Sequence, residues 1–478
     1  MRDIMRHTFV ATALALLIAG CAVDQDKEVE TYRKVLDHPV LQTAATQSAS
    51  PLTLDRALAM ANVTSEQLNE RGEDYLQSLI DKNRAVAAFL PTVTFQPYYE
   101  VEEKPNSSSA WGVGSGFRRL NNNTSQRFEA PVNGSINLFR GGGDKANVKA
   151  ADAIIEQRKQ LLLDAQFTVL VNVAQVFYQV LRSEQSLVVL QNSVKLQEAR
   201  VQDEVQKRDN GLSTNLAVAQ ARAQLDNTRA LRTQAEGDVI NGRNTLSYVI
   251  GEQVGNTPLV DNLQVPSPRP NAETYEVIAI QYRNDIQAAQ AQVEAARALV
   301  DVAVSQYYPS VNLNVQGFLY REYFSDASKW NAILSANIPI FSAGVIRADV
   351  RTAWSRLRQA AMIESDTKRS AIREVRSAYQ NLITAERRTT ELRGAVEASN
   401  EALRQAQAAL ANNLGIVLDV LTAQDAVLNS QLQLTSAEFD RSIFYLDLLR
   451  ATGKLPVNLP VRPLNKPTSG PTTDAVIR

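Results

Sequence analysis

Few side chains in this sequence could do covalent or metal chemistry. The 478 residues include one cysteine, Cys21, and two histidines, His7 and His38. A single cysteine excludes a disulfide framework, and a Cys/His zinc site lacks ligands because His7 lies in a leader segment. The Asp, Glu, Lys and Arg residues are scattered along helical patterns and form no catalytic constellation with a nucleophile or base. The sequence therefore predicts a protein that is not an enzyme and holds no cofactor or metal.

Composition and one glycine run also bear on nucleotide and nucleic-acid chemistry. The chain has 50 basic and 51 acidic side chains, so it has no excess positive charge with which to bind nucleic acid. The run Gly141-Gly142-Gly143 could be mistaken for a phosphate loop, but no GxxxxGK[ST] signature is present. The run predicts a turn from strand to helix, and any energy for transport must come from partner proteins.

Cys21 has a specific chemical context. Thr8–Ala19 is a 12-residue apolar run behind a basic start, too short for a membrane helix of about 20 residues. It ends in Ile18-Ala19-Gly20-Cys21, which resembles the lipobox of bacterial lipoproteins, where the cysteine thiol receives a diacylglyceryl group. We expect a signal peptide at 1–20, lipid attachment at Cys21 and a flexible lipid-anchored tether at 21–50. An ordinary signal peptide that happens to contain a cysteine is the open alternative.

Further membrane spans must use β-strands, because we find no other apolar stretch of 18 residues. Four segments of about ten residues alternate between apolar and amide-rich positions, as outer-membrane barrel strands do. Aromatic residues collect at both ends of these segments, where interfacial girdles belong. A soluble β-sandwich is the alternative, but it would need more than four strands. The predicted strands are at about 91–101, 128–139, 309–320 and 330–341.

The chain is a tandem duplication. An offset of 202 residues aligns the segment after Ser135 with that after Asn337 and persists without a gap for over a hundred residues. Upstream the offset is 218, so the first copy holds 16 extra residues in the loop at 102–126. The predicted division is a first repeat at 51–258, a linker at 259–270, a second repeat at 271–453 and a Pro-rich tail at 454–478.

Each repeat continues into long helices. No Gly or Pro interrupts Asp144–Asp209, and only Gly394 interrupts Val345–Leu414. Apolar residues recur every seven positions in both, which predicts coiled-coil packing. Turns around Gly211 and Asn413 lead into return helices at 212–250 and 416–452, and shorter helices at 53–88 and 272–306 precede the strands. The predicted fold class is α+β, mostly α, with two helical hairpins hanging from two β-hairpins.

Four strands cannot close a barrel, and open strand edges in hydrocarbon leave backbone groups without hydrogen bonds. The smallest barrels have about eight strands. Closure must therefore be intermolecular, and three protomers would supply twelve strands.

The order of these features resembles the TolC/OprM-like family of outer-membrane efflux channels, in its lipoprotein branch. The resemblance covers about residues 51–453 and rests on the lipobox, the duplication, the strand-to-helix motifs and Asn284-Asp285-Ile286. It implies a homotrimer with a 12-stranded barrel in the outer membrane of a Gram-negative bacterium, extended into the periplasm by an α-helical barrel. It also implies a periplasmic adaptor (membrane fusion) protein and an inner-membrane transporter as partners.

The same resemblance implies that the helix tips close the periplasmic aperture. Asp419 matches a family aspartate, and threefold symmetry would make it a cation-attracting ring of carboxylates. A role as a helix-start residue, favourable to the helix dipole, is equally open. We expect closure mainly by packing of Leu410, Leu414 and Leu418. The other aperture candidates lie in the two turns: Asp209, Asn210, Gly211, Asn412 and Asn413.

One rival function shares the lipid anchor and the helical hairpin. A periplasmic coiled-coil adaptor lipoprotein would have a Gly-rich β-domain split around a single hairpin and no amphipathic strands. The duplication disfavours that alternative, and the sequence favours a channel that conducts substrates passively.

Overall fold

A computed structural model describes residues 24–37, 51–103, 124–261, 263, 265–268, 271–321, 328–412 and 414–454. The predicted signal peptide and Cys21 lie outside these residues, as do most of the 102–126 loop and nearly all of the tail. The chain divides into a sheet unit (74–159 and 288–365) and a helical unit (described residues within 1–73, 160–287 and 366–478). Each unit takes segments from both repeats, so the copies in the sequence are not two spatial domains.

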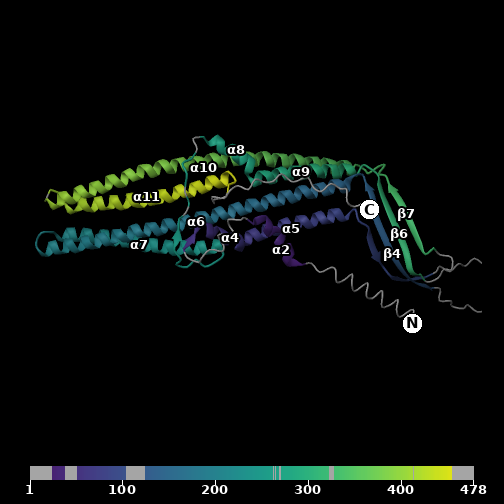
Figure 1. Cartoon of the computed structure of the whole chain (residues 1–478), viewed down its shortest axis with the longest axis horizontal. Coiled ribbons are helices and arrows are strands. Elements are labelled where there is room, and N and C mark those ends of the chain that lie inside the picture. The colour runs from purple at the N-terminus through teal and green to yellow at the C-terminus, as the bar shows by residue number, and fades with distance from the viewer. Residues whose placement is uncertain are drawn as a thin grey trace, which may run out of the picture. The chain divides into compact units, whose positions relative to one another are not determined.

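The sheet unit is built around an antiparallel sheet of five strands, two of which share one place in the sheet. Its strands are β2 (Thr92–Phe95), β3 (Tyr98–Glu103), β4 (Thr124–Arg140), β6 (Ser310–Arg321) and β7 (Trp330–Asn337). The order is β2-β4-β6-β7, and β3 pairs with β4 farther along the same side. β4, β6 and β7 lie side by side in Figure 1.

The strand boundaries differ from the predicted ones where proline intervenes. The first predicted strand is divided into two, β2 and β3, because Pro97 has no N–H for the ladder. Just before the break, the Gln96 N–H donates to the carbonyl of Pro131 at 3.2 Å. β7 ends at Asn337, two residues before Pro339, instead of continuing to 341. β4 is longer than predicted and starts at Thr124.

Parts of four helices complete the sheet unit: α5 (Glu66–Ala87), α6 (Gly143–Asp209), α9 (Asn284–Ser305) and α10 (Val345–Ala411). Val300 and Ala303 of α9 pack on Ala353 of α10. The glycine run forms the turn into α6, with φ of +61° at Gly141 and +82° at Gly142. Any side chain at Gly141 would collide with the carbonyl oxygen of Ser305 at the end of α9, so the turn requires glycine.

The helical unit contains two helical hairpins. α6 returns through α7 (Asn215–Ile250), and α10 returns through α11 (Val417–Ala451), as Figure 1 shows. α4 (Leu54–Thr64) and α8 (Ala272–Tyr282) are separate short helices. The predicted helices at 53–88 and 272–306 are therefore each broken in two, at Ser65 and Arg283, where the backbone is extended.

Residues 25–36 correct the prediction of a flexible tether. They form helix α2 (Gln25–Leu36), in which Tyr32 and Leu36 are buried. A side chain at Gly72 would overlap the ring of Tyr32, so α2 lies directly on α5. Gln166 of α6 donates a hydrogen bond of 2.8 Å to the carbonyl of Leu36. This part of the segment after Cys21 is folded against the helical unit.

The linker between the repeats is also partly structured. Leu259–Val260 forms β5, which pairs in parallel with β1 (Leu52–Thr53), so the first linker residues return to the start of the first repeat. Tyr178 of α6 donates its hydroxyl to the Asp261 carboxylate at 2.5 Å.

The expectation that no other apolar stretch suits a membrane was too strict. α6 contains an 18-residue stretch apolar enough to span one by length and composition, and 56% of it is buried inside the structure. The fully buried Leu170, Phe177 and Tyr178 belong to this helix. Its apolar character is explained by its place in the core of the helical unit.

Candidate functional site

One face of the sheet presents rows of uncharged polar side chains. The register places Thr94, Asn133, Gln316 and Asn331 side by side across four strands. The next row holds Thr92, Ser135 and Asn314, and the Thr92 and Ser135 hydroxyls are 3.0 Å apart. Ile333 completes that second row as an apolar member of the amide face. Such a face can hydrogen-bond to water and polar solutes without a fixed charge.

The opposite face of the sheet is apolar. It carries the alternate residues of the same strands, and they are exposed or half-exposed in the single chain. Aromatic side chains flank it, with Phe128 and Tyr320 in ring contact at 5.7 Å at one end and Phe139 at the other. Trp111, Tyr323 and Phe324, which are among the aromatic residues near the strand ends in the sequence, lie outside the described residues. The face includes Val93, Phe95, Val132, Ile136, Leu313, Val315, Leu334 and Trp330.

The sheet has two open edges. Within the described strands, nothing pairs with the outer side of β7, or with the sides of β2 and β3 that face away from β4. An open apolar edge of this kind needs another strand before it can enter hydrocarbon.

The tip of the first hairpin is tightly organised. α6 ends at Asp209, whose carboxylate accepts from Arg208 at 2.6 Å. Gly211 has φ +74°, and the next amide, of Leu212, donates to the Lys207 carbonyl at 2.7 Å, which closes the helix end in a Schellman-type turn. Asn210, between them, donates its backbone N–H to Gln206. Thr214 caps α7 by accepting from the Ala217 amide at 3.1 Å.

A buried ion pair in the last turns of α6 is hydrogen-bonded to the turn of that first tip. Arg200 Nη2 lies 2.8 Å from Glu204 Oε1, and Glu204 is only 1% exposed. The other Glu204 oxygen accepts a 2.8 Å hydrogen bond from the hydroxyl of Ser213 in the turn. The sequence prediction missed this network.

The tip of the second hairpin is built differently. Asn412 donates its side-chain amide to the Ala408 carbonyl at 2.9 Å. Asp419 stands in the first turn of α11, where its carboxylate accepts from the Ile416 amide at 3.2 Å. This contact realises the helix-start role of Asp419, and a ring with other protomers stays a prediction.

The three leucines that are predicted to close the aperture, Leu410, Leu414 and Leu418, do not form a buried cluster within one chain. Leu414 and Leu418 are 84% and 48% exposed, whereas Leu410 is half-buried. Asn413 lies outside the described residues, and so does Cys21. The aperture candidates therefore fall at two separate hairpin ends of the helical unit, and closure by their leucines stays a prediction.

Three polar contacts that the sequence analysis missed tie the two hairpins together. Each uses an aspartate of α11: Asp447 accepts from Gln175 at 2.5 Å, Asp440 from Arg182 at 3.0 Å, and Asp425 from Gln224. Burial raises the pKa of Asp425 and Asp447, and the hydrogen bonds from the amides partly offset this. The seven-residue spacing of Asp440 and Asp447 was a signal for one shared helix face.

With this geometry in place, the chain can be compared with known proteins. The family model described as "Outer membrane efflux protein" matches residues 42–252 and 277–454. The two matched segments fall on the two repeats and include every strand of the described sheet.

Curated relatives are distant. The chain is 24% identical over 289 residues to the probable outer membrane lipoprotein SilC of Salmonella typhimurium, a match that spans 59% of this chain and 62% of that protein. It is 27% identical over 336 residues to the outer membrane efflux protein BepC of Brucella suis, spanning 66% and 70%. The names of these relatives describe outer-membrane and efflux proteins.

Solved structures share the fold. The outer membrane protein VceC of Vibrio cholerae superposes with a TM-score of 0.73 at 18% identity, covering 84% of this chain and 97% of that one. The open state of the MtrE outer membrane channel of Neisseria gonorrhoeae gives 0.71 at 18% identity, covering 84% and 89%. The predicted fold, α+β and mostly helical, is confirmed by these neighbours.

Proposed function

The chain belongs to the outer membrane efflux protein family, and from that premise we propose that it is the outer-membrane channel of a tripartite efflux or secretion system. The observation that carries the proposal is the two-faced sheet with open edges. Its apolar face suits lipid, and its amide face suits an aqueous passage that conducts polar solutes passively. The names of its relatives describe efflux and outer-membrane proteins, which supports a role in transport rather than catalysis.

A homotrimer is the assembly that this sheet supports. β2 and β3 share one place beside β4, so the sheet of each copy has four strand places, and its β7 edge and its β2/β3 edge are unpaired. Joining these edges between three copies gives a closed barrel of twelve strand places. The second long helix is consistent with the same assembly, because Trp354 and Met362 of α10 are exposed in one chain. Neighbouring protomers would cover part of this surface.

The attachment to the membrane follows the predicted lipobox. We propose that Cys21 carries the lipid and that α2 holds the following segment on the helical unit through Tyr32 and Leu36. Acyl chains on Cys21 would add a second hold on the outer-membrane lipid beside the barrel.

The partners follow from what the chain lacks and from its family. With no nucleotide-binding signature in its sequence, the channel depends on an inner-membrane transporter for energy and on a periplasmic adaptor to reach it. The helix tips, with Leu212, Leu414 and Leu418 exposed, are the proposed periplasmic aperture. Asp419 is the proposed selectivity carboxylate there.

The decisive test uses the purified full-length protein in planar bilayers, with chemical crosslinking in parallel. We expect a crosslinked trimer and discrete channel conductance. A protein that stays monomeric and produces no conductance would reject both the channel and the trimer. Mass spectrometry of the N-terminal peptide tests Cys21 separately, and an unacylated mature N-terminus would reject the lipid anchor alone.

A further inference from the structure

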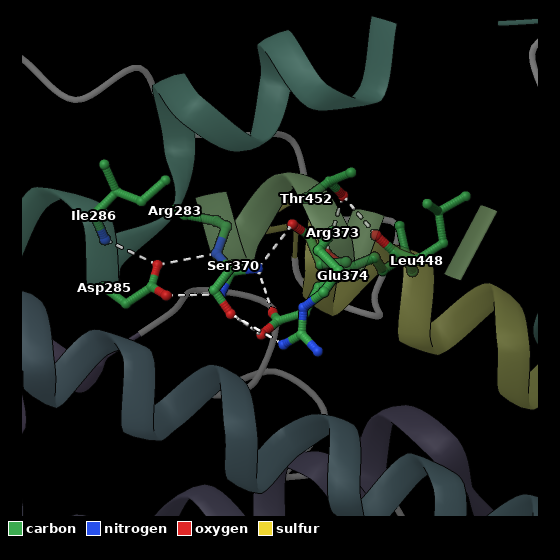
Figure 2. A network of polar contacts seen from close by, with 10 residues as sticks. Arg283, Asp285, Ile286, Ser370, Arg373, Glu374, Leu448 and Thr452 are labelled. Carbon is green, nitrogen blue, oxygen red and sulfur yellow. Dashed lines mark hydrogen bonds and ion pairs between the residues drawn. The ribbon is translucent and has the colours of Figure 1, made fainter. Parts of the chain in front are cut away.

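A polar junction in the helical unit lies apart from the proposed aperture. Arg283, between α8 and α9, lies at its centre. Its guanidinium donates two hydrogen bonds to the Asp285 carboxylate, from Nε to Oδ1 at 2.9 Å and from Nη2 to Oδ2 at 2.6 Å (Figure 2). Its remaining nitrogen, Nη1, donates to Glu374 Oε2 of α10 at 2.7 Å and to the Ala451 carbonyl of α11 at 3.4 Å. One guanidinium thus joins three elements of the second repeat.

The carboxylates of this junction have further partners. Asp285 Oδ1 also accepts from the Ile286 amide at 2.9 Å, in the first turn of α9. Glu374 Oε1 accepts from the Ser370 hydroxyl at 3.3 Å. Gly453, with φ +71°, passes so close to Arg283 that a side chain there would crowd its backbone. Residues of the second repeat therefore provide hydrogen-bond donors to both carboxylates, those of Asp285 and Glu374.

A third acid, Asp164, reaches the same place from α6 of the first repeat. It lines a cavity of about 210 Å³ together with Thr168, Arg283, Asp285, Glu374 and Arg450. In the part of the chain that the structure describes, no hydrogen bond or ion pair to the side-chain carboxyl group of Asp164 is found. Arg283, the cation at the centre, is already bonded to the other two acids.

The surroundings of Asp164 favour its neutral form. Burial is the largest cause, and the negative charges of Asp285 and Glu374 act in the same direction. The positive charges of Arg283 and of Arg450, on α11, oppose them. The net effect raises the pKa of Asp164 from 3.8 to about 6. These four groups are the charges that face Asp164 from the α8–α9 corner, α10 and α11.

We propose that Asp164 is a proton-operated latch between the two repeats, closed when its carboxyl group is neutral and loosened when the ionised group repels Asp285 and Glu374. A neutral carboxyl group also carries a proton that it can donate to a carboxylate oxygen in the cavity. α6 then holds the junction more firmly in acid than at neutral pH. The latch goes beyond the proposed channel function and does not rest on it, because it concerns the stability of the folded chain.

The sequence duplication supplies a matched control. Asp366 of α10 is the repeat counterpart of Asp164, 202 residues later. Its side chain is 78% exposed and pairs with Arg369 at 3.1 Å. Asp366→Asn therefore makes the same chemical change at the same repeat position, but outside the cavity.

The test is the thermal unfolding midpoint of the full-length protein and both variants in detergent, from pH 4 to pH 8. A raised folded-state pKa means that the wild type loses stability as pH rises from about 4 to about 6, with no further loss above. Asp164→Asn lacks this loss, so its midpoint should match the wild type near pH 4 and exceed it by about 3–8 °C above pH 6. Asp366→Asn should follow the wild type throughout.

Hydrogen exchange provides a second reading where unfolding is irreversible. Amides around residue 164 should exchange faster at pH 7.5 than at pH 5 in the wild type, after correction for intrinsic rates, and equally at both in Asp164→Asn. A wild-type midpoint with no greater pH dependence than that of Asp164→Asn would overturn the latch. So would equal corrected exchange at both pH values in the wild type.

Discussion

The two long helices of this protein are the same element used in two ways. α6 and α10 are both 67 residues long and stand at equivalent places in the two repeats. Yet α6 buries Leu162, Leu170 and Phe177 completely, and their counterparts 202 residues later are Glu364, Ile372 and Tyr379, none of which is fully buried. Length and heptad spacing set the helix, while its neighbours decide how much of it is core.

The neighbours of the two helices explain the difference. α6 is covered by the N-terminal segment and by the start of the first repeat: Gln166 donates to the Leu36 carbonyl of α2 and to the Asn62 side chain of α4. α10 buries a narrower stripe made largely of alanine, such as Ala353, Ala371 and Ala378. Small residues allow close helix approach but contribute little burial. α10 is therefore the helix whose stability should depend more on an assembled trimer.

The largest expected effect comes from truncating the core of α6. Phe177 is fully buried, so Phe177→Ala should cost about 3–5 kcal/mol of stability through lost burial and a cavity. Tyr379, its counterpart, packs at the surface against Tyr275 with ring centroids 5.9 Å apart. Tyr379→Ala should cost less than half as much. Chemical denaturation of the two variants measures the ratio, and equal losses would contradict the contrast between the helices.

A second contrast concerns the hairpin tips. The first tip has Arg200, Glu204 and Ser213 in its buried network, and the second has Ala402, Ala406 and Gly415 at the same repeat positions. Glu204→Ala should leave Arg200 without its buried partner and remove the hydrogen bond from Ser213 in the turn. The expected loss of stability is about 2–4 kcal/mol. Limited proteolysis at 209–214 should then become as fast as at 411–416.

The control for that prediction is Ala406→Ser, which adds a polar group at the matching place in the second tip and should leave cleavage there unchanged. If Glu204→Ala leaves the first turn as resistant as before, the ion pair does not hold the tip, and Gly211 with its helix-end hydrogen bonds accounts for its order.

The sequence could predict what local pattern dictates and little of what distant packing decides. Alternation located the strands to within a few residues at most ends, and proline explains the main differences, as at Pro97. Asp164 and Asp366 show the limit, since they are the same residue at one repeat position, one beside a cavity and one in solvent. The apolar neighbours of Asp164, such as Leu162 and Phe167, against Glu364 and Arg369 beside Asp366, indicate which of the two faces a core. They do not reveal the cavity, because it is formed by Arg283 and Glu374 from other helices.

In the candidate site, too, local features were predictable from the sequence and contacts between distant residues were not. The glycine at position 211 predicted a turn, and its φ of +74° shows that the turn uses the left-handed conformation. The contacts between the hairpins were not predicted, because Asp425 and Gln224 stand 201 residues apart and only the packing of α7 on α11 joins them. A heptad comparison of the α11 aspartates would have suggested the face but not the partners.

At the second tip the expected effect on stability is smaller, and the effect on conduction is the sharper test. Asp419→Ala removes the hydrogen bond to the Ile416 amide, worth about 1 kcal/mol at a helix start. If three Asp419 carboxylates also form a ring, the variant should lose cation selectivity and block by divalent ions in single-channel recordings. Asp209→Ala, at the first tip, is the matched control and should keep both. Unchanged selectivity in Asp419→Ala would leave this residue with its helix-start role alone.

The smallest expected effect returns to the exposed helix. Gly394 lies inside α10, and a β-carbon added there would meet nothing within 4 Å. Gly394→Ala should therefore stabilise α10 by about 0.5–1 kcal/mol, since alanine loses less backbone entropy in a helix than glycine. Gly211→Ala is the opposite case, because its φ of +74° strains any side chain although the space around it is equally open. Denaturation midpoints that move in opposite directions would show that backbone conformation, not room, separates these two glycines, and a loss of stability in Gly394→Ala would mean that the exposed face of α10 is packed against a neighbour in solution.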